Sequence, residues 1–424
     1  MLFKLLQQKF SSQLVRNMGW MGAAEFANRI FRLATTVTLA RVFSKYDFGL
    51  AAIIFTCFDI GHVFTVKNGL TEKIIQADTQ DLATICNTTY WLSWALGGLV
   101  ASFQCAAAFA LAYFYQDAQL VLPLCAMAVV FLIMPGYKIQ YSLIVRENRL
   151  KVIALCNAVQ SLLANIITVI FALLGMGVWA VVWPIILTTP VWLFICLLNH
   201  RWQPPKQFDL KGWKGIALFA KNLLGVEILA KVVGNLDYFL IGRFIGLEAL
   251  GVYFFAFNAG LGISLNVMDK FLVALFPHLC EARTNAVLFR KRYFHALRTL
   301  AIFFVPLILC QVFLLPIYVP IVFGKQWIAS IPIISLVCLS ALPRPFWLGS
   351  VMLLDATDQT NISFRLNVIF TLIFAIAISV SVHHGLIWVA TSVLLTHCTF
   401  LPVFTIWCSR HVLSKIGNSE AINT

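Results

Sequence analysis

Long apolar runs, separated by short breaks, cover nearly all of this 424-residue chain. A helix that crosses a bilayer needs about 20 mainly apolar residues, and on that measure the runs predict about 12 spanning helices. Backbone polar groups in lipid must be hydrogen-bonded within the chain, and the runs lack the alternation of barrel strands, so we expect helices. The predicted fold is therefore an all-α polytopic membrane protein with almost no soluble domain. We place the spans near residues 18–40, 48–68, 84–113, 119–137, 152–173, 177–199, 217–241, 250–276, 299–322, 328–352, 362–382 and 386–408.

The composition excludes several classes of soluble protein. Hydrophobic residues make up 61% of the chain, charged residues only 11%, and the mean hydropathy is +0.88. The net charge of +14 does not indicate a nucleic-acid partner, because the 31 Lys and Arg lie mostly in short breaks between apolar runs. Most of the 11 Cys stand singly inside apolar runs, without the spacing of metal ligands. We therefore expect no metal site, no cofactor and no nucleic-acid partner.

The distribution of Lys and Arg predicts the topology. Alternate breaks, including residues 138–151, 201–214 and 279–298, hold most of these cations, while the breaks between them hold few. Basic loops stay in the cytoplasm, so both termini are predicted to be cytoplasmic, in agreement with an even number of helices. The outward loops are too short for the acidic catalytic loop that membrane glycosyltransferases and polymerases carry. We therefore expect no enzyme.

The two halves of the chain align with each other in order. Because each half holds six helices, both halves enter the membrane in the same orientation, and an axis along the membrane normal should relate them. We expect two six-helix bundles, residues 1–200 and 201–424, around a central cavity, an arrangement typical of transporters with alternating access. The aligned pairs include Glu25 with Glu227, Arg29 with Lys231, Arg41 with Arg243, Pro123 with Pro332 and Trp179 with Trp388.

A few charged residues lie inside the predicted spans. Each costs about 2.5 to 3.5 kcal/mol at mid-bilayer, so each needs a partner or water. Glu25, Arg29 and Arg32 follow one another at i, i+4 and i+7 and share a helix face, which we expect to face the cavity. The candidate cations for an anionic head group are Arg29, Arg32, Lys231 and Lys270. The candidate carboxylates are Glu25, Asp59, Glu227, Asp237 and Asp269, as coupling groups for H+ or Na+ or as plain partners of the cations.

Two interpretations of these charges stay open from sequence. Glu227 and Lys231 could line the cavity, or they could neutralise each other and join two helices. The same choice holds for Asp59 and for the neighbouring Asp269 and Lys270. Separately, Arg344 stands between Pro343 and Pro345, which predicts that the tenth helix is broken there.

Several segments resemble oligosaccharide-lipid flippases of the Wzx type, in the multidrug, oligosaccharidyl-lipid and polysaccharide exporter superfamily. The segment ARVFSKYDFGLAA after the first predicted helix is similar to the family's signature, although Lys45 stands where relatives commonly have Pro. Further similar segments follow in order over nearly the entire chain: GVWAVVW at 177–183, LDYFLIGRFIG at 236–246, LGVYFFAFN at 250–258, LFPHL at 275–279 and VFGKQW at 322–327.

The resemblance implies a flippase in the bacterial inner membrane. Its cargo would be an oligosaccharide repeat unit linked to undecaprenyl diphosphate, carried to the periplasmic leaflet for O-antigen, capsule or exopolysaccharide synthesis. Its partners would be membrane lipids, a polysaccharide polymerase and a chain-length regulator. Guanidinium groups such as those of Arg29 and Arg32 suit a diphosphate. The rival functions are a cation-coupled multidrug or metabolite antiporter of the same superfamily and, less consistent with the short outward loops, a membrane polysaccharide polymerase.

Overall fold

The computed structural model of the protein describes residues 31–66, 69–204, 231, 234–261, 264, 268, 275–283 and 285–423. These residues form helices and connecting turns, and none of them forms a strand. They divide into two compact units, residues 1–235 and 236–424, each considered by itself below. Most of residues 201–235 lie outside the described part of the chain, so the boundary predicted after residue 200 stays a prediction.

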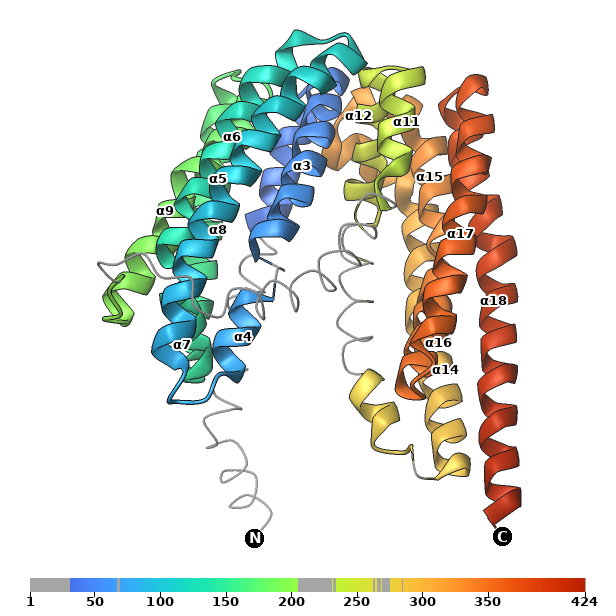
Figure 1. Cartoon of the computed structure of the whole chain (residues 1–424). Helices are drawn as coiled ribbons and strands as arrows, with labels where there is room; N and C mark the ends of the chain where they lie inside the picture. The colour runs from blue at the N-terminus through green and yellow to red at the C-terminus, as the bar shows by residue number, and fades with distance from the viewer. Residues whose placement is uncertain are drawn as a thin grey trace, which may run out of the picture. The chain divides into compact units, whose positions relative to one another are not determined.

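The N-terminal unit is a bundle of long helices (Figure 1). Residues 31–42 are helical, and α3 packs against α5 and α6, where the Phe58 ring stacks on Phe131 at 5.1 Å between centroids. Gly69, with φ of +74°, precedes α4, because a left-handed turn there favours a residue without a side chain. The elements are α3 (Lys45–Val66), α4 (Leu70–Gln76), α5 (Leu82–Tyr115), the short η1 (Ala118–Leu120), α6 (Val121–Ile133), α7 (Pro135–Arg146), α8 (Leu150–Leu173) and α9 (Trp179–Asn199).

The C-terminal unit is also helical, and its longest helices run beside one another (Figure 1). Asn285 begins α14 by accepting a hydrogen bond from the Leu288 backbone N–H at 2.9 Å, as an N-cap residue does. The elements are α11 (Leu236–Phe244), α12 (Leu247–Phe255), the π-helical η2 (Ala256–Leu261), α14 (Ala286–Tyr318), the π-helical η3 (Val319–Phe323), η4 (Lys325–Ser330), α15 (Ile331–Ser340), α16 (Arg344–Ala356), α17 (Thr360–Ser381), η5 (Val382–His384) and α18 (Leu386–Asn423).

Among the described residues, both units contain a helix that is interrupted at a proline. In the C-terminal unit α15 ends at Ser340 and α16 begins at Arg344, which confirms the break predicted from the two flanking prolines. In the N-terminal unit α6 and α7 meet at Pro135 with a bend of 49°. The fourth span was expected to end near residue 137, whereas α7 continues to Arg146. The division of the chain into two six-helix bundles stays a prediction.

The described residues hold eight helices long and apolar enough to cross a membrane, or nine if the bent α6–α7 pair counts as one span. These nine coincide with nine of the predicted spans. The predicted spans 18–40 and 217–241 lie largely outside the described residues, and of 250–276 only residues 250–261, 264, 268 and 275–276 are described. The all-α polytopic fold is therefore confirmed.

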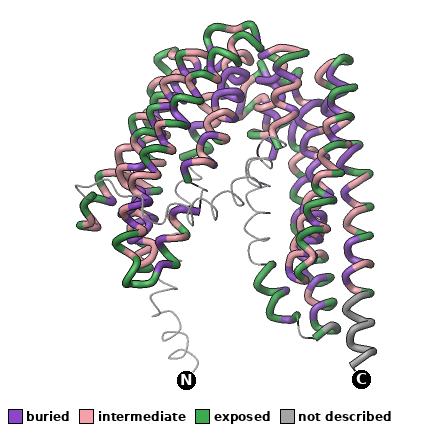
Figure 2. Tube along the Cα trace, in the orientation of Figure 1, coloured by how far each residue is buried: buried purple, intermediate pink, exposed green. Residues whose placement is uncertain are grey.

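The long helices expose much of their apolar surface, as the green and pink segments of Figure 2 show. Within the most apolar window of each helix, 11% of residues are buried in α17 and 22% in α8, against 56% in the α3–α4 segment. Apolar surface that no protein covers requires lipid as its solvent. The segment that carries Asp59 is thus the most enclosed of these helices.

The structure also corrects a predicted loop in the C-terminal unit. Residues 279–298 were expected to form a basic cytoplasmic loop, but α14 begins at Ala286 and continues through Arg298 into the apolar span. Two arginines of this segment form ion pairs within the unit: Arg292 pairs with Glu281 at 3.1 Å, and Arg283 pairs with Asp358. The basic residues therefore extend a helix beyond its apolar part instead of forming a flexible connection.

Candidate functional site

An ion pair inside the N-terminal unit brings together two residues singled out by the sequence. The Lys231 Nζ donates a hydrogen bond to the Asp59 Oδ2 at 3.0 Å. Asp59 lies midway along α3, far from Lys231 in sequence, so two separate predicted spans meet here. Neither side chain is buried: 36% of Lys231 and 55% of Asp59 is exposed. A pair with this exposure, within apolar spans, is suited to a water-accessible surface rather than to a dry core.

Arg32 is exposed on the helical segment 31–42. One turn further along this segment, the Thr35 hydroxyl donates to the Asn165 Oδ1 of α8 at 2.6 Å. The Asn165 side-chain amide in turn donates to the Ser161 carbonyl oxygen at 2.7 Å. This chain of hydrogen bonds fixes the segment that carries Arg32 against α8.

The polar face of α8 was missed by the sequence analysis. Asn157, Ser161 and Asn165 recur at i, i+4 and i+8 and so share one face of an otherwise apolar helix. One turn of this face also presents Gln160, whose Oε1 accepts a hydrogen bond from the Trp192 indole N–H at 2.5 Å. The i, i+4, i+8 spacing could have revealed this face, but the sequence analysis considered only charged residues inside the apolar runs.

Two cations predicted to lie in a loop instead satisfy helix ends. The Lys138 ammonium of α7 is buried and donates to the Thr65 carbonyl oxygen in the last turn of α3. The Arg146 Nη1, at the end of α7, donates to the Ile74 carbonyl oxygen at 2.8 Å and also to the Ala77 carbonyl oxygen. The last carbonyl oxygens of a helix have no hydrogen-bond donor within the helix. Lys138 and Arg146 supply donors to these oxygens at the ends of α3 and α4.

The C-terminal unit contains a buried polar cluster around Asp237, in the first turn of α11. Only 5% of Asp237 is exposed, and its Oδ2 accepts a hydrogen bond from the fully buried Tyr253 hydroxyl at 2.9 Å. Its Oδ1 accepts from the Tyr238 backbone N–H at 3.0 Å. Arg344, at the break between α15 and α16, interacts electrostatically with this cluster and lies 5.8 Å from the Phe257 ring centroid. The carboxylate is therefore hydrogen-bonded on both oxygens.

His397 of α18 lies close to the same helix break. Only 2% of it is exposed, and its ring stacks against Phe370 and Phe374 of α17 at 5.6 and 5.7 Å between centroids. It hydrogen-bonds the backbone of Ser340, the last residue of α15. The sequence showed this histidine only as an isolated polar residue in a span, because its partners come from two other helices, α15 and α17.

The remaining predicted site residues cannot be placed. Glu25, Arg29, Glu227, Asp269 and Lys270 lie outside the described residues. Within the described part of the chain, no group of three or more His, Cys, Asp or Glu could hold a metal ion. The roles assigned to all these residues stay predictions.

Comparison with known proteins agrees with the expected resemblance. A family model described as "Polysaccharide biosynthesis protein" matches residues 38–332. Similar curated proteins include the teichuronic acid biosynthesis protein TuaB of Bacillus subtilis, 25% identical over 75% of this chain and 66% of its own length. The succinoglycan biosynthesis transport protein ExoT of Rhizobium meliloti is 23% identical over 77% of this chain and 66% of its own length. This chain thus spans slightly less than two thirds of both proteins. The lipopolysaccharide biosynthesis protein WzxC of Escherichia coli is 24% identical over 82% of this chain and 70% of its own length.

Solved structures share the fold. The lipid II flippase MurJ in an inward closed conformation aligns with a TM-score of 0.75 at 13% identity, over 95% of this chain and 90% of its own. An inward-facing multidrug resistance transporter of the MATE family, in the MOP superfamily, aligns with a TM-score of 0.71 at 14% identity, over 92% and 96%. At such identities the likeness shows the fold alone. By their printed names, MurJ is a flippase, the MATE protein is a multidrug resistance transporter and ExoT is a transport protein.

Proposed function

Because this chain belongs to the family of polysaccharide biosynthesis proteins, we propose that it is a flippase for lipid-linked oligosaccharides. Its cargo is an undecaprenyl-diphosphate-linked repeat unit, moved by alternating access to the outer leaflet of the inner membrane. The product serves O-antigen, capsule or exopolysaccharide synthesis. The names of TuaB, ExoT and WzxC, each tied to a surface polysaccharide, support this class of cargo.

The observation that carries the proposal is the exposed ion pair of Lys231 and Asp59. The diphosphate of this cargo is esterified at both ends and is therefore a dianion, which must lose part of its hydration in a membrane. Fixed cations reduce that cost. Lys231 is held by a carboxylate yet remains 36% exposed, and Arg32 is exposed as well. In our proposal Arg29, Arg32, Lys231 and Lys270 bind the diphosphate, and Asp59 releases Lys231 when cargo arrives.

We assign the carboxylates to two different tasks. Asp237 is buried and hydrogen-bonded on both oxygens, so we give it a pairing role within the C-terminal unit. Asp59 is exposed and can exchange its partner for water, a proton or Na+, so we propose that it couples transport to an ion gradient. Glu25, Glu227 and Asp269 are further candidates for this coupling. No resident cofactor is needed.

We place the protein in the bacterial inner membrane with both termini in the cytoplasm. A polysaccharide polymerase and a chain-length regulator are the expected partners, because they would take up the flipped repeat unit. A reporter active only in the periplasm, fused after residue 424, should remain inactive. An active fusion would contradict the proposed topology.

Loss of the cavity cations gives the direct test. The double variant Arg29→Ala and Arg32→Ala should abolish surface polysaccharide and leave lipid-linked repeat units in the cytoplasmic leaflet, with the protein still in the membrane. Arg201→Ala, which removes an exposed cation outside the spans, is the matched control and should leave surface polysaccharide unchanged. Full surface polysaccharide in the double variant would exclude the proposed role of these cations.

The rival function is a cation-coupled antiporter for drugs or metabolites, which the structural likeness to the MATE transporter keeps under consideration. Deleting the protein distinguishes the two. A flippase deletion removes surface polysaccharide and leaves drug sensitivity unchanged. An antiporter deletion sensitises the cell to cationic drugs and leaves the polysaccharide intact.

A further inference from the structure

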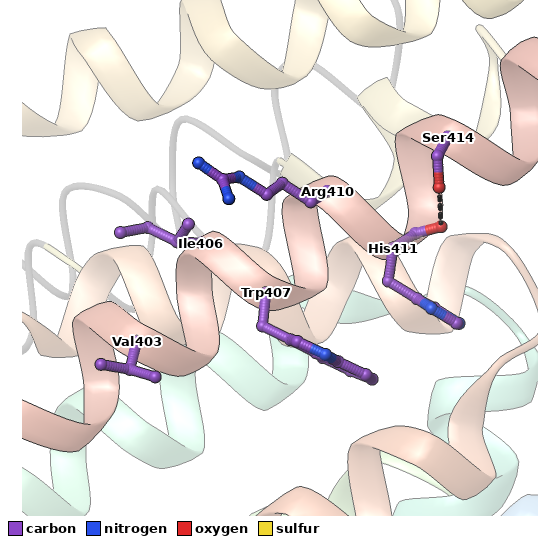
Figure 3. Close-up of a pocket in the computed structure, with 6 residues that line it drawn as sticks. All are labelled: Val403, Ile406, Trp407, Arg410, His411 and Ser414. Carbon is purple, nitrogen blue, oxygen red and sulfur yellow. Dashed lines mark hydrogen bonds between the residues drawn. The ribbon is translucent and has the colours of Figure 1, made fainter.

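A groove of about 570 Å³ runs along one face of α18 (Figure 3). Its lining residues follow one another at helical spacing, so they share a face. The opposite face carries Leu401, Cys408 and Val412, which are buried in the C-terminal unit. The groove is lined by Val403, Ile406, Trp407, Arg410, His411 and Ser414.

The lining changes from apolar to polar along the helix axis. Val403 and Ile406 form the apolar end, and both are more than half exposed. Trp407 follows, stacked on the His411 ring at 4.9 Å between centroids. Arg410 and Ser414 form the polar end. This order matches a phospholipid, whose acyl chains lie below a glycerol and phosphate.

The length of α18 places this change of polarity at a membrane interface. Trp388 near the start of the helix and Trp407 are both exposed, and tryptophan prefers the two interfaces of a bilayer. At 1.5 Å per residue they lie about 28 Å apart along the axis, close to the roughly 30 Å thickness of the hydrocarbon core. Arg410 and Ser414 therefore lie at the depth of the head groups.

The polar end carries unsatisfied groups. Among the described residues, no carboxylate lies within 4.0 Å of the Arg410 guanidinium. The buried His411 Nε2 has no hydrogen-bond partner. No acidic residue lines the groove, so no carboxylate there would pair with the cationic part of a zwitterionic head group. The groove thus offers hydrogen-bond donors to an anion and no negatively charged side chain to a cation.

We propose that this groove binds one anionic phospholipid, with its acyl chain along Val403 and Ile406. The guanidinium of Arg410 binds the phosphodiester through two parallel hydrogen bonds, which Lys could not form. His411 and Trp407 contact the glycerol region. The groove provides one fixed cation, which matches a single phosphodiester rather than the diphosphate of the transported lipid. The site is therefore separate from the cargo site and holds a lipid of the surrounding bilayer.

Native mass spectrometry of the full chain tests the proposal. Delipidated protein in detergent is titrated with phosphatidylglycerol, or with phosphatidylcholine of the same acyl chains. Wild-type protein should retain phosphatidylglycerol preferentially, and Arg410→Gln should raise its half-saturating concentration roughly tenfold, the effect of losing one charged hydrogen-bonding partner. Arg365→Gln, which removes an exposed arginine from neighbouring α17, is the matched control and should bind as wild type does.

A second variant guards against a folding defect at Arg410. Ile406→Trp fills the apolar end and leaves the guanidinium in place, so it should also weaken retention of phosphatidylglycerol. Equal retention of the two lipids by wild-type protein, or unchanged retention in both variants, would overturn the proposal. Binding of undecaprenyl diphosphate in place of phosphatidylglycerol, with the same dependence on Arg410, would overturn the assignment of the occupant.

Discussion

Removing the Asp59–Lys231 ion pair tests whether these two charges face water. The perturbation is a double-mutant cycle with Asp59→Asn, Lys231→Gln and the combination of both. If the pair lies at a water-filled surface, each single variant leaves a charge that water can hydrate. If it lies in lipid, Asp59→Asn leaves a cation that lipid cannot hydrate, at a cost of about 2.5 to 3.5 kcal/mol.

The expected magnitude follows from the geometry. At 3.0 Å between Nζ and Oδ2, Coulomb's law gives about 1.4 kcal/mol at a dielectric constant of 80 and about 5.5 kcal/mol at 20. With 36% and 55% of the two side chains exposed, screening brings the pair toward the lower value, and exposed pairs typically measure about 0.2–1 kcal/mol. We therefore expect a coupling free energy of about 1 kcal/mol.

The assay is reversible unfolding in mixed micelles, with the free energy of unfolding measured for the wild type and the three variants. A second cycle on Arg149 and Glu147 supplies the scale for an aqueous pair, because these side chains are 3.2 Å apart with 40% and 45% exposure. The charge-swapped protein, Asp59→Lys with Lys231→Asp, should recover the stability lost in the single variants. It should not recover transport, because the cation has left its position.

Two results would refute the reasoning. A loss above about 2 kcal/mol in Asp59→Asn alone would show that Lys231 has no water to hydrate it, contrary to the proposed cargo site. Strict additivity of the two single variants, with no recovery in the charge swap, would show that the two groups do not interact.

Three further predictions concern the contact between two helices, a buried carboxylate and the end of a helix. Gly97→Ala should lower the melting temperature sharply, because a Cβ there would lie 2.5 Å from a backbone oxygen of α6. Gly98→Ala is the control: a Cβ there meets open space, so this variant should be neutral or stabilising. Thermal unfolding of both variants checks this. Tyr253→Phe should lower the free energy of unfolding by about 1–3 kcal/mol, because the buried Asp237 carboxylate loses a hydrogen-bond donor. Tyr113→Phe, at a side chain that is 89% exposed, is the control and should leave the free energy of unfolding unchanged in the same assay. Arg146→Gln should speed proteolysis of α4, and an unchanged digestion rate would contradict its capping role.

The spans were predictable because hydropathy reports what lipid can solvate. Nine predicted spans coincide with apolar helices, and the break at Arg344 followed from the proline on each side. The bend at Pro135 was not predicted, because the fourth span was expected to run without a break to its end near residue 137. Hydropathy also missed the first three turns of α14, since charged residues there extend the helix outside the hydrocarbon.

The candidate site was predictable only in part. Sequence identified Asp59 and Lys231 as charges that need partners, but not that they pair with each other. Spacing reveals neighbours on one helix, whereas this contact joins residues far apart in the chain. The cluster of Asp237, Tyr253 and Arg344 could not be predicted for the same reason, because each residue comes from a different helix. A tyrosine in an apolar run also gives no sign that it has a charged partner.

The positions of Lys138 and Arg146 have a consequence for how topology is measured. Before the helices pack, these cations help to decide which side of the membrane their segment stays on. Afterwards their donors are committed to the carbonyl oxygens at the ends of α3 and α4. In a scan that deletes charges one at a time, removing either cation would therefore affect both the insertion of its segment and the later packing of the helices. A reporter that moves to the wrong side and a correctly inserted protein that is degraded would both result from the same substitution, and only a pulse-labelled insertion assay would separate them.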